Sequence, residues 1–362
     1  MKKHKGLKIA LLAVGSLFGL IIVFLAGVLI FASATTLKVK NKEEMAVNGE
    51  VSTKINKDNN IKLLTWNVGY GALDDEEDCY WDGGKGVYGQ SKEKVEENII
   101  AIRNKISELD PDIFFLQELD LNSKRSYYIN ELNMFKETFT SDKYKESFAK
   151  NFKAGLVPLP LYQMTGRVDA GISTFSKFDI SYSERIQLPI PFSWPMKLFN
   201  LKRCLLVSRI PIDGIDKELI IINLHLEAYD DGEGKAKQLE MLMNIMDEEY
   251  KKGNYVIAGG DFNQTFSTTN YGLYPKMNDW VCPVIDAESY PDFTFRMDDS
   301  TPTCRSLYKP YKDANKGVTE FQYYMIDGYI VSNNILINSL ETLDLGFKNT
   351  DHNPVVMSIK LN

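Results

Sequence analysis

The chain has 362 residues, of which 44% are hydrophobic and 25% charged, and this ordinary globular composition excludes a largely disordered protein. Its net charge is −7 at pH 7, and no run of Lys or Arg occurs after residue 60. The sequence therefore lacks the basic patch that accompanies tight nucleic-acid binding. A weakly binding nuclease is not excluded, because a bound metal ion supplies positive charge of its own.

The N-terminus carries lysines at positions 2, 3, 5 and 8, followed by an uncharged run over residues 9–36. About 25 helical residues span roughly 37 Å, more than the hydrocarbon core of about 30 Å. A cleaved signal peptide is the alternative, since Ala32-Ser33-Ala34 resembles a cleavage site, but its apolar core would be only about 7–15 residues long. We expect residues 1–36 to be a cytoplasmic tail and a transmembrane signal anchor. The protein would then be a single-pass cell-membrane protein whose folded domain lies outside the cytoplasm.

Residues 37–60 are polar, rich in Lys and Asn, and free of aromatic residues. That composition predicts a flexible tether. The remaining residues, 61–362, are enough for one large domain with a full hydrophobic core.

Apolar runs typical of buried strands recur along residues 61–362, and each leads to polar residues. The runs cover residues 61–66, 112–116, 219–222, 255–258 and 324–326. Helical spacing of apolar residues predicts helices over residues 93–109 and 235–250. The polar residues beside the runs are Asn67, Glu118, His225, Asp261, Asn263, Asp327, Asp351 and His352.

Each of these polar residues has an ordinary explanation when it is considered alone. Asn67 and Asp327 precede glycine-rich stretches typical of turns, and His225 in an apolar stretch is more often a core histidine. The chain has only three histidines, however, and His225 and His352 both lie beside acids or amides. Chance explains the whole set poorly, because α/β scaffolds place functional groups at strand ends.

The motifs, in their order along the chain, resemble the endonuclease/exonuclease/phosphatase superfamily, whose fold is that of DNase I. The resemblance covers residues 61–362. It implies a four-layer α/β/β/α sandwich of two mixed sheets. One position departs from some members, because Gly69 stands where they carry a carboxylate. The matching motifs are Thr65-Trp66-Asn67, Gln117-Glu118, Asn223-Leu224-His225, Gly260-Asp261-Phe262-Asn263, Ile326-Asp327-Gly328-Tyr329 and Thr350-Asp351-His352-Asn353-Pro354-Val355.

The resemblance implies a metal-dependent phosphoric ester hydrolase in which Glu118 is the principal metal ligand. Asn67 and Asp351 would support it. Such oxygen donors suit Mg²⁺, with Mn²⁺ as the alternative.

By the same resemblance, Asp261 orients or deprotonates the attacking water, and Asn263 holds that water or the phosphate. His225 and His352 would donate hydrogen bonds to the phosphate oxygens, and Asp327 would hold the tautomer of His352.

The substrate remains open at the level of the sequence. A phosphodiester in nucleic acid or in a lipid headgroup is the leading expectation. A phosphomonoester of inositol or another small molecule and a non-catalytic binding module are the alternatives. Residues 151–203 are rich in Pro and aromatic residues, as in a rim of the site, a lipid-contacting patch or a packed surface excursion. No protein partner is evident.

Four arginines and four cysteines complete the candidates. The guanidinium group matches phosphate geometry, so the arginines are candidates for phosphate contacts. The cysteines have no Cys-x-x-Cys spacing, which argues against a zinc site. Cys282 and Cys304 are the favoured disulfide pair, and four reduced thiols are the alternative. These residues are Arg167, Arg203, Arg296 and Arg305, and Cys79, Cys204, Cys282 and Cys304.

Overall fold

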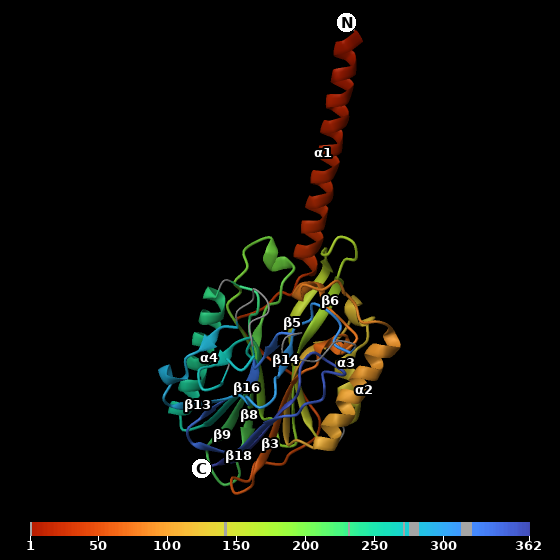
Figure 1. Ribbon diagram of the computed structural model, residues 1–362. Helices are drawn as coiled ribbons and strands as arrows, with labels where there is room; N and C mark the ends of the chain where they lie inside the picture. The colour runs from red at the N-terminus through yellow and green to blue at the C-terminus, as the bar shows by residue number, and fades with distance from the viewer. Residues whose placement is uncertain (1, 141–142, 231, 271, 275–281, 313–320) are drawn as a thin grey trace.

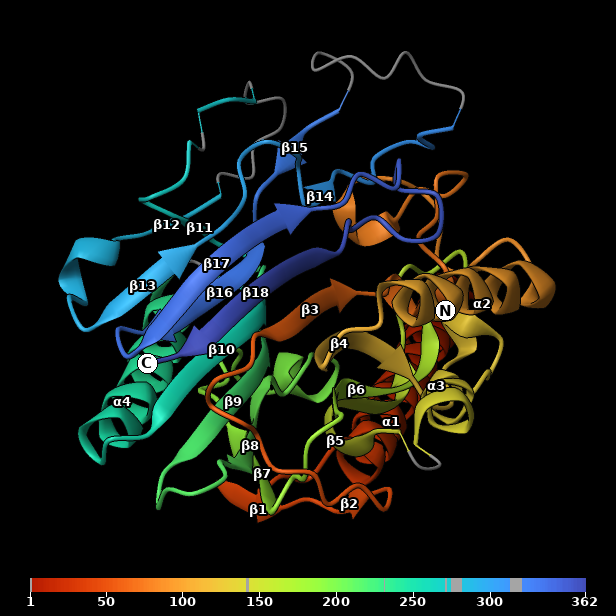
Figure 2. The same ribbon diagram turned by 90° about the horizontal axis from the view of Figure 1, so that it is seen from below.

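The computed structural model describes residues 2–140, 143–230, 232–270, 272–274, 282–312 and 321–362. Two seven-stranded sheets lie face to face, with α4 on one outer side and α2 and α3 on the other (Figures 1 and 2). This arrangement confirms the predicted four-layer α/β/β/α sandwich of two mixed sheets.

The first sheet contains, in spatial order, β17 (Ile335–Thr342), β18 (Val355–Leu361), β3 (Ile61–Asn67), β4 (Ile113–Asp120), β6 (Gly166–Ser176), β5 (Lys145–Val157) and β2 (Val47–Asn48). The second contains β1 (Lys42–Glu44), β7 (Tyr182–Gln187), β8 (Cys204–Pro211), β9 (Glu218–His225), β10 (Tyr255–Asp261), β16 (Asp327–Ser332) and β13 (Phe293–Arg296). Two small ribbons pair β11 (Thr265–Phe266) with β12 (Val284–Ile285) and β14 (Cys304–Arg305) with β15 (Tyr323–Tyr324). The helices are α1 (Lys2–Thr35), α2 (Lys92–Leu109), α3 (Glu131–Phe139) and α4 (Glu233–Lys251).

The hydrophobic core explains why the central strands are apolar on both faces. Leu63 and Phe115 of the first sheet meet Ile221 and Ile257 of the second in a fully buried layer. Alternate residues of the same strands face outward and pack under α2 and α3 on one side and α4 on the other. Strands covered on both faces have no solvent side, so the usual alternation of apolar and polar residues disappears.

Strand direction brings the polar ends together. β3 runs parallel to β4, and β9 runs parallel to β10. Asp327 differs from the sequence prediction, because it begins β16 instead of following a strand. Since β16 is antiparallel to β10 and pairs Asp327 with Asp261, the start of one strand reaches the end of the other.

Residues 37–60 differ from the flexible tether that their composition predicts. β1 pairs with β7 and β2 with β5, so this segment adds an edge strand to each sheet. Val51 and Ile55 are buried against the domain. Two short strands and two buried aliphatic side chains are enough to hold a polar segment, and they leave little trace in its composition.

All four cysteines are free, so the disulfide expected between Cys282 and Cys304 is not formed. Cys204 lies fully buried within β8, as expected for a core thiol. The free thiols leave the fold dependent on packing and hydrogen bonds.

Helix α1 projects away from the sandwich as a separate rod (Figure 1). Its stretch Gly6–Thr35 has 30 residues, includes an 18-residue segment with a mean hydropathy of 2.8, and is long and apolar enough to cross a membrane. Its apolar side chains are exposed, as in Leu12 and Phe24. A helix that packs against little protein needs an apolar environment for those side chains.

Candidate active site

Three strands from the two sheets meet at one buried amide. Asn67 ends β3, and its Nδ2 donates to Glu118 Oε1 of β4 at 2.9 Å and to Asp261 Oδ2 of β10 at 3.0 Å. Its Oδ1 accepts from the backbone N–H of Gly69 at 3.0 Å, which fixes the orientation of the amide. One side chain therefore links a carboxylate of each sheet.

A local irregularity positions Glu118. The pairing of β4 with β6 shifts register between Leu116 and Leu119, and Glu118 adopts a left-handed φ of 58°. The preceding residue, Gln117, fixes this irregular part of β4 to the opposite sheet, because its Nε2 donates to Asn223 Oδ1 at 2.8 Å. Bulges and left-handed non-glycine residues are costly and concentrate at functional sites.

Gly69 occupies the position at which some relatives carry a carboxylate. A Cβ at this position would lie 2.9 Å from Thr350 Oγ1 and 3.0 Å from Asp351 Oδ1, and the φ of 51° disfavours any side chain. The close packing of Thr350 and Asp351 therefore requires glycine at the position where some relatives carry a carboxylate.

His352 and Asp327 form a buried pair on the second sheet's side of the site. His352 Nδ1 lies 2.8 Å from Asp327 Oδ2, and His352 Nε2 lies 3.8 Å from Asp261 Oδ2. Burial opposes protonation of His352, but attraction to Asp327 outweighs it and raises the pKa of the imidazole well above its usual value. His352 is therefore a charged donor held by Asp327.

His225 has the opposite electrostatic character. Its Nε2 lies 3.4 Å from Asp261 Oδ2 and 4.0 Å from Glu118 Oε1. Burial, followed by the charges of Arg203, His352 and Arg125, lowers the pKa of His225 well below its usual value. Its Nδ1 is buried and has no hydrogen-bond partner among the described residues.

Negative charge is crowded at the centre of the site. Burial and the neighbouring Asp327 raise the pKa of Asp261 to about 7, although His352 acts in the opposite direction. Burial raises the pKa of Asp351 to about 6. The charge of His352 lowers this pKa, and the charge of Glu118 raises it. Carboxylates that resist ionisation in this way fit a divalent cation, whose charge would favour their ionised forms.

The donor set also fits such a cation chemically. The ligand atoms of Asp261, Asp327 and His352 lie within 4.8 Å of one another, and so do those of Cys304, Asp351 and His352, although the charged His352 would not itself bind a cation. Glu118 is the most open of the carboxylates, with 22% of its side chain exposed. Oxygen-rich sites of this kind favour Mg²⁺ or Mn²⁺ over structural Zn²⁺.

The structure brings all eight sequence-predicted residues into this one constellation. The backbone N–H of Asn263 donates to Asp261 Oδ1 at 2.9 Å, and its Nδ2 donates to Leu226 O. Asp351 Oδ2 lies 3.9 Å from His352 Nε2.

The four candidate arginines do not gather in the same way. Arg203 is buried and lies 3.4 Å from Glu227, and buried Arg305 donates to the backbone carbonyl of Asp74. Arg167 and Arg296 are exposed. Arg203 Nη1 donates to the backbone carbonyl of His225 at 3.3 Å and Arg305 N donates to that of Asp351 at 3.1 Å, so these two arginines adjoin the constellation through its backbone.

Sequence reasoning missed two neighbours of the site. Cys304 forms a backbone bridge with His352, and burial raises the pKa of its thiol to about 12, which keeps it neutral. Arg125 lies 3.5 Å from the ring centroid of Tyr70 and donates two hydrogen bonds to Asp120. Neither residue has a distinctive spacing, although Tyr70 lies within the glycine-rich turn after Asn67.

Comparisons with known proteins agree with this geometry. The endonuclease/exonuclease/phosphatase family model matches residues 64–306. The search of curated proteins gave no match.

Three solved structures show the same fold at low sequence identity. An endonuclease/exonuclease/phosphatase protein from Beutenbergia cavernae is 15% identical, with a TM-score of 0.56, over 84% of this chain and 72% of that one. The human Nocturnin catalytic domain with bound sulfate is 14% identical, with a TM-score of 0.52, over 88% and 97%. D. rerio TDP2 complexed with a single-strand DNA product is 15% identical, with a TM-score of 0.51, over 84% and 100%.

The family match covers more than half of the chain and includes Asn67, Glu118, His225, Asp261 and Asn263. Enzymes of this family use divalent metal ions, in agreement with the crowded carboxylates. This chain belongs to the endonuclease/exonuclease/phosphatase family and is a phosphoric ester hydrolase.

Proposed function

We propose that the protein is a Mg²⁺-dependent phosphodiester hydrolase held at the cell membrane by α1, with its catalytic domain outside the cytoplasm. The observation that carries the proposal is the bridge from Asn67 to Glu118 and Asp261, with both histidines beside Asp261. One solved structure of this fold is complexed with a single-strand DNA product and another is described as a 2′,3′-cyclic phosphatase, and both descriptions fit a phosphodiester substrate.

Glu118 and Asp351 would hold the cation, and Asn67, predicted as a further ligand, would support it by fixing the carboxylate of Glu118 with its Nδ2. Bound Mg²⁺ would offset the negative charge of the phosphoryl oxygens as it grows in the transition state. Glu118 is partly exposed, so an incoming phosphate can approach this ligand without displacing the buried core.

Asp261 is the residue we assign to the attacking water. Its carboxylate is held by Asn67 and by the backbone N–H of Asn263, which fixes the direction of its oxygens. Burial and the neighbouring Asp327 raise its pKa, which makes it a stronger proton acceptor than a solvated aspartate. Asn263, whose amide is anchored by Leu226, would orient the same water or the phosphate.

The two histidines, which lie beside Asp261, would donate hydrogen bonds to the phosphate. His352 is charged and held by Asp327, so its Nε2 can donate to a phosphoryl oxygen. Neutral His225 can donate one hydrogen bond, and which nitrogen carries its proton follows from what binds there. Preorganised donors of this kind stabilise developing negative charge.

The test uses the full chain in detergent with a soluble aryl phosphodiester. We expect hydrolysis that requires Mg²⁺, stops in EDTA, and is nearly abolished in Glu118→Gln and Asp261→Asn. Asp216→Asn, an exposed carboxylate in the turn between β8 and β9, is the matched control and should keep wild-type activity. Metal-independent turnover, or full turnover in Asp261→Asn, would contradict the proposal.

An aryl phosphomonoester in the same assay separates the two bond types. A preference for the diester supports the proposal, whereas a strong preference for the monoester would make the protein a phosphatase instead.

A further inference from the structure

The foot of α1 (residues 31–37) lies at the same end of the sandwich as the active site. Gly155 N, near the end of β5, donates to Thr35 Oγ1 at 3.1 Å, and Leu37 N donates to Lys153 O at 2.9 Å. β5 and β4 are both antiparallel to β6, so they run in the same direction. The ends of β5 and β4, and with them Glu118, therefore face the side from which α1 emerges.

The foot of α1 packs tightly against the domain. A Cβ at Gly155 would lie 2.5 Å from Thr35 Oγ1 and 2.9 Å from Phe31 Cε1, so only glycine allows this close approach. Lys202 Nζ donates to Thr36 Oγ1 at 2.6 Å. Because the uncharged run continues to Thr36, where α1 meets the domain, a bilayer crossed by α1 would lie close to the domain.

Two loops, here called the rim loops, flank the foot of α1. They are residues 158–165, between β5 and β6, and residues 188–203, between β7 and β8. β7 and β9 are both antiparallel to β8, so the second rim loop also leaves from the active-site end. Figure 1 shows both loops rising beside the base of the helix.

The rim loops expose large apolar side chains that the domain does not cover. Leu161 is 77% exposed and Trp194 is 60% exposed, and Tyr162 and Met196 are also exposed. Tyr and Trp are the residues that settle at the boundary between lipid and water.

The same loops border the active site. Tyr162 Oη donates to the backbone carbonyl of Lys85, in the segment that follows Asn67. Arg203, at the end of the second rim loop, donates to the backbone carbonyl of His225 at 3.3 Å. A surface that contacts the rim loops therefore also lies over the approach to the site.

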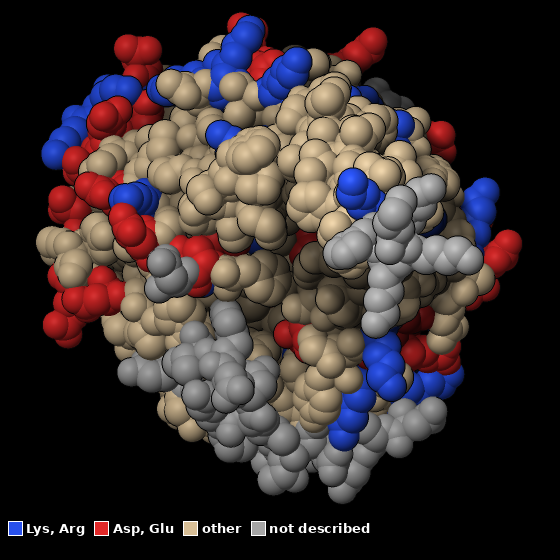
Figure 3. All heavy atoms as spheres, turned by 90° about the horizontal axis from the view of Figure 1, so that it is seen from above, with Lys and Arg blue, Asp and Glu red and all other residues tan. Residues whose placement is uncertain are grey.

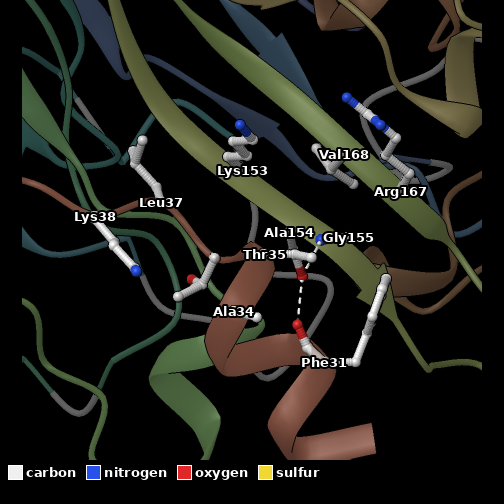
Figure 4. Close-up of a pocket in the computed structure, with 11 residues that line it drawn as sticks. Phe31, Ala34, Thr35, Leu37, Lys38, Lys153, Ala154, Gly155, Arg167 and Val168 are labelled. Carbon is white, nitrogen blue, oxygen red and sulfur yellow. Dashed lines mark hydrogen bonds between the residues drawn. The ribbon is translucent and has the colours of Figure 1, made fainter.

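The segments that form the foot of α1 and the rim loops are basic, although the chain as a whole is acidic. Residues 31–42, 151–168 and 188–203 contain eight Lys or Arg and no Asp or Glu, although the net charge is −7. Figure 3 looks onto this face, where charged side chains gather mainly toward the edges. Lys38, Lys153 and Arg167 line a groove of about 680 Å³ beside Phe31 and Thr35 (Figure 4).

We propose that the α1 foot and the rim loops dock on an anionic lipid bilayer, so that the active site receives the phosphodiester of a lipid in that leaflet. Apolar side chains of the rim loops enter the interface, and the basic groove takes a lipid phosphate. The choice of substrate rests on the proposed phosphodiesterase function, whereas the docking does not.

The reaction is a balanced hydrolysis. The oxygen of water bonds to phosphorus as one P–O ester bond breaks. One proton of the water passes to the departing alcohol, and the other remains on the phosphomonoester.

Docking is tested on the full chain in nanodiscs of phosphatidylcholine and phosphatidylglycerol. A fluorophore on Leu161→Cys or Trp194→Cys should be strongly quenched by a lipid-borne spin label. Ile215→Cys, in an exposed turn at the opposite end of the strands, should not be quenched. Labelling of the parent chain corrects for the native thiols. Equal quenching at all three positions, or none at 161 and 194, would overturn the docking.

The substrate is tested with vesicles of the same two lipids. We expect Leu161→Asp combined with Trp194→Asp to lower the ratio of lipid to aryl-diester hydrolysis at least about tenfold, while Ile215→Asp leaves the ratio unchanged. Trp194→Gln, a milder change, should lower it in the same direction. An unaltered ratio in both rim-loop variants would overturn the inference.

The two failures are distinguishable. If the wild-type chain cleaves no aryl diester, the proposed function fails and the quenching still decides the docking. If it cleaves the aryl diester and plasmid DNA but no lipid, the phosphodiesterase stands and the lipid substrate is wrong.

Discussion

The two ends of β9 carry ionic clusters of opposite kinds. At its start, Arg209 lies 2.9 Å from Glu218 and 2.6 Å from Glu249. Burial raises the pKa of Glu249, but hydrogen bonds from Arg209, Lys252 and Asn254 outweigh it and lower that pKa to about 2. At its end, beside His225, burial and neighbouring charge raise the pKa of Asp261 to about 7.

The two clusters differ in the source of the positive charge that compensates their carboxylates. At the far end the chain itself provides an arginine and a lysine, so ionised carboxylates stabilise the fold. At the site end the carboxylates repel one another, and a cation from solution would relieve them. The cluster at the start of β9 stabilises the fold. The cluster at its end keeps carboxylates close together at a cost in stability, in an arrangement that serves catalysis.

The largest expected effect is the loss of catalysis on removing the base. Asp261→Asn should lower kcat/KM for the aryl phosphodiester by about 10²–10⁴-fold, because the water loses its proton acceptor. Steady-state kinetics with Mg²⁺ measure the change. A loss smaller than tenfold would show that Asp261 is not the base.

A smaller loss is expected when only the support of His352 is removed. Asp327→Asn keeps the side-chain volume but weakens the imidazolium, so activity should fall by about 10–100-fold. The pH–rate profile should change as well, because the pKa of His352 loses the influence that raises it. An effect on rate with an unaltered profile would mean that Asp327 acts only through packing.

At the far end the expected change is in stability alone. Glu249→Gln should lower the free energy of unfolding by about 1–3 kcal/mol at pH 7, because Arg209 loses a buried partner. The pKa of Glu249 is lowered on folding, so its stabilisation is present above its usual value of 4.5 and is lost as pH falls toward 2. Denaturant unfolding at several pH values should show wild type and variant converging in acid. A constant difference would contradict this.

The smallest expected effect is that of a reducing agent. Because all four cysteines are free, dithiothreitol should leave the unfolding midpoint unchanged. Alkylation of the unfolded chain without reduction should modify all four thiols, and protection of two of them would show a disulfide that the structure lacks.

Much of the fold and site can be predicted from the sequence because parallel buried strands leave a clear pattern. Runs that are apolar on both faces identify the central strands, and Asn67, His225 and Asp261 directly end three of them. Their meeting point follows from strand direction, which a family resemblance supplies.

Other features depend on tertiary contacts that a linear pattern does not encode. The left-handed φ of Glu118 arises from the register shift with β6, and Cys304 reaches His352 through a single bridge between distant segments. Residues 37–60 join the sheets through two short strands, whose composition resembles that of a linker.

The response of stability to Mg²⁺ tests the central claim most directly. Thermal unfolding of the full chain would be followed in EDTA and in excess Mg²⁺ for wild type, Glu118→Gln and Asp216→Asn. Metal at a hundred times its Kd would stabilise the folded state by about 2.7 kcal/mol, so the midpoint of wild type and Asp216→Asn should rise while that of Glu118→Gln barely changes. An equal rise of the unfolding midpoint in all three proteins, or no rise in wild type, would contradict the claim that the carboxylates at the end of β9 bind a cation.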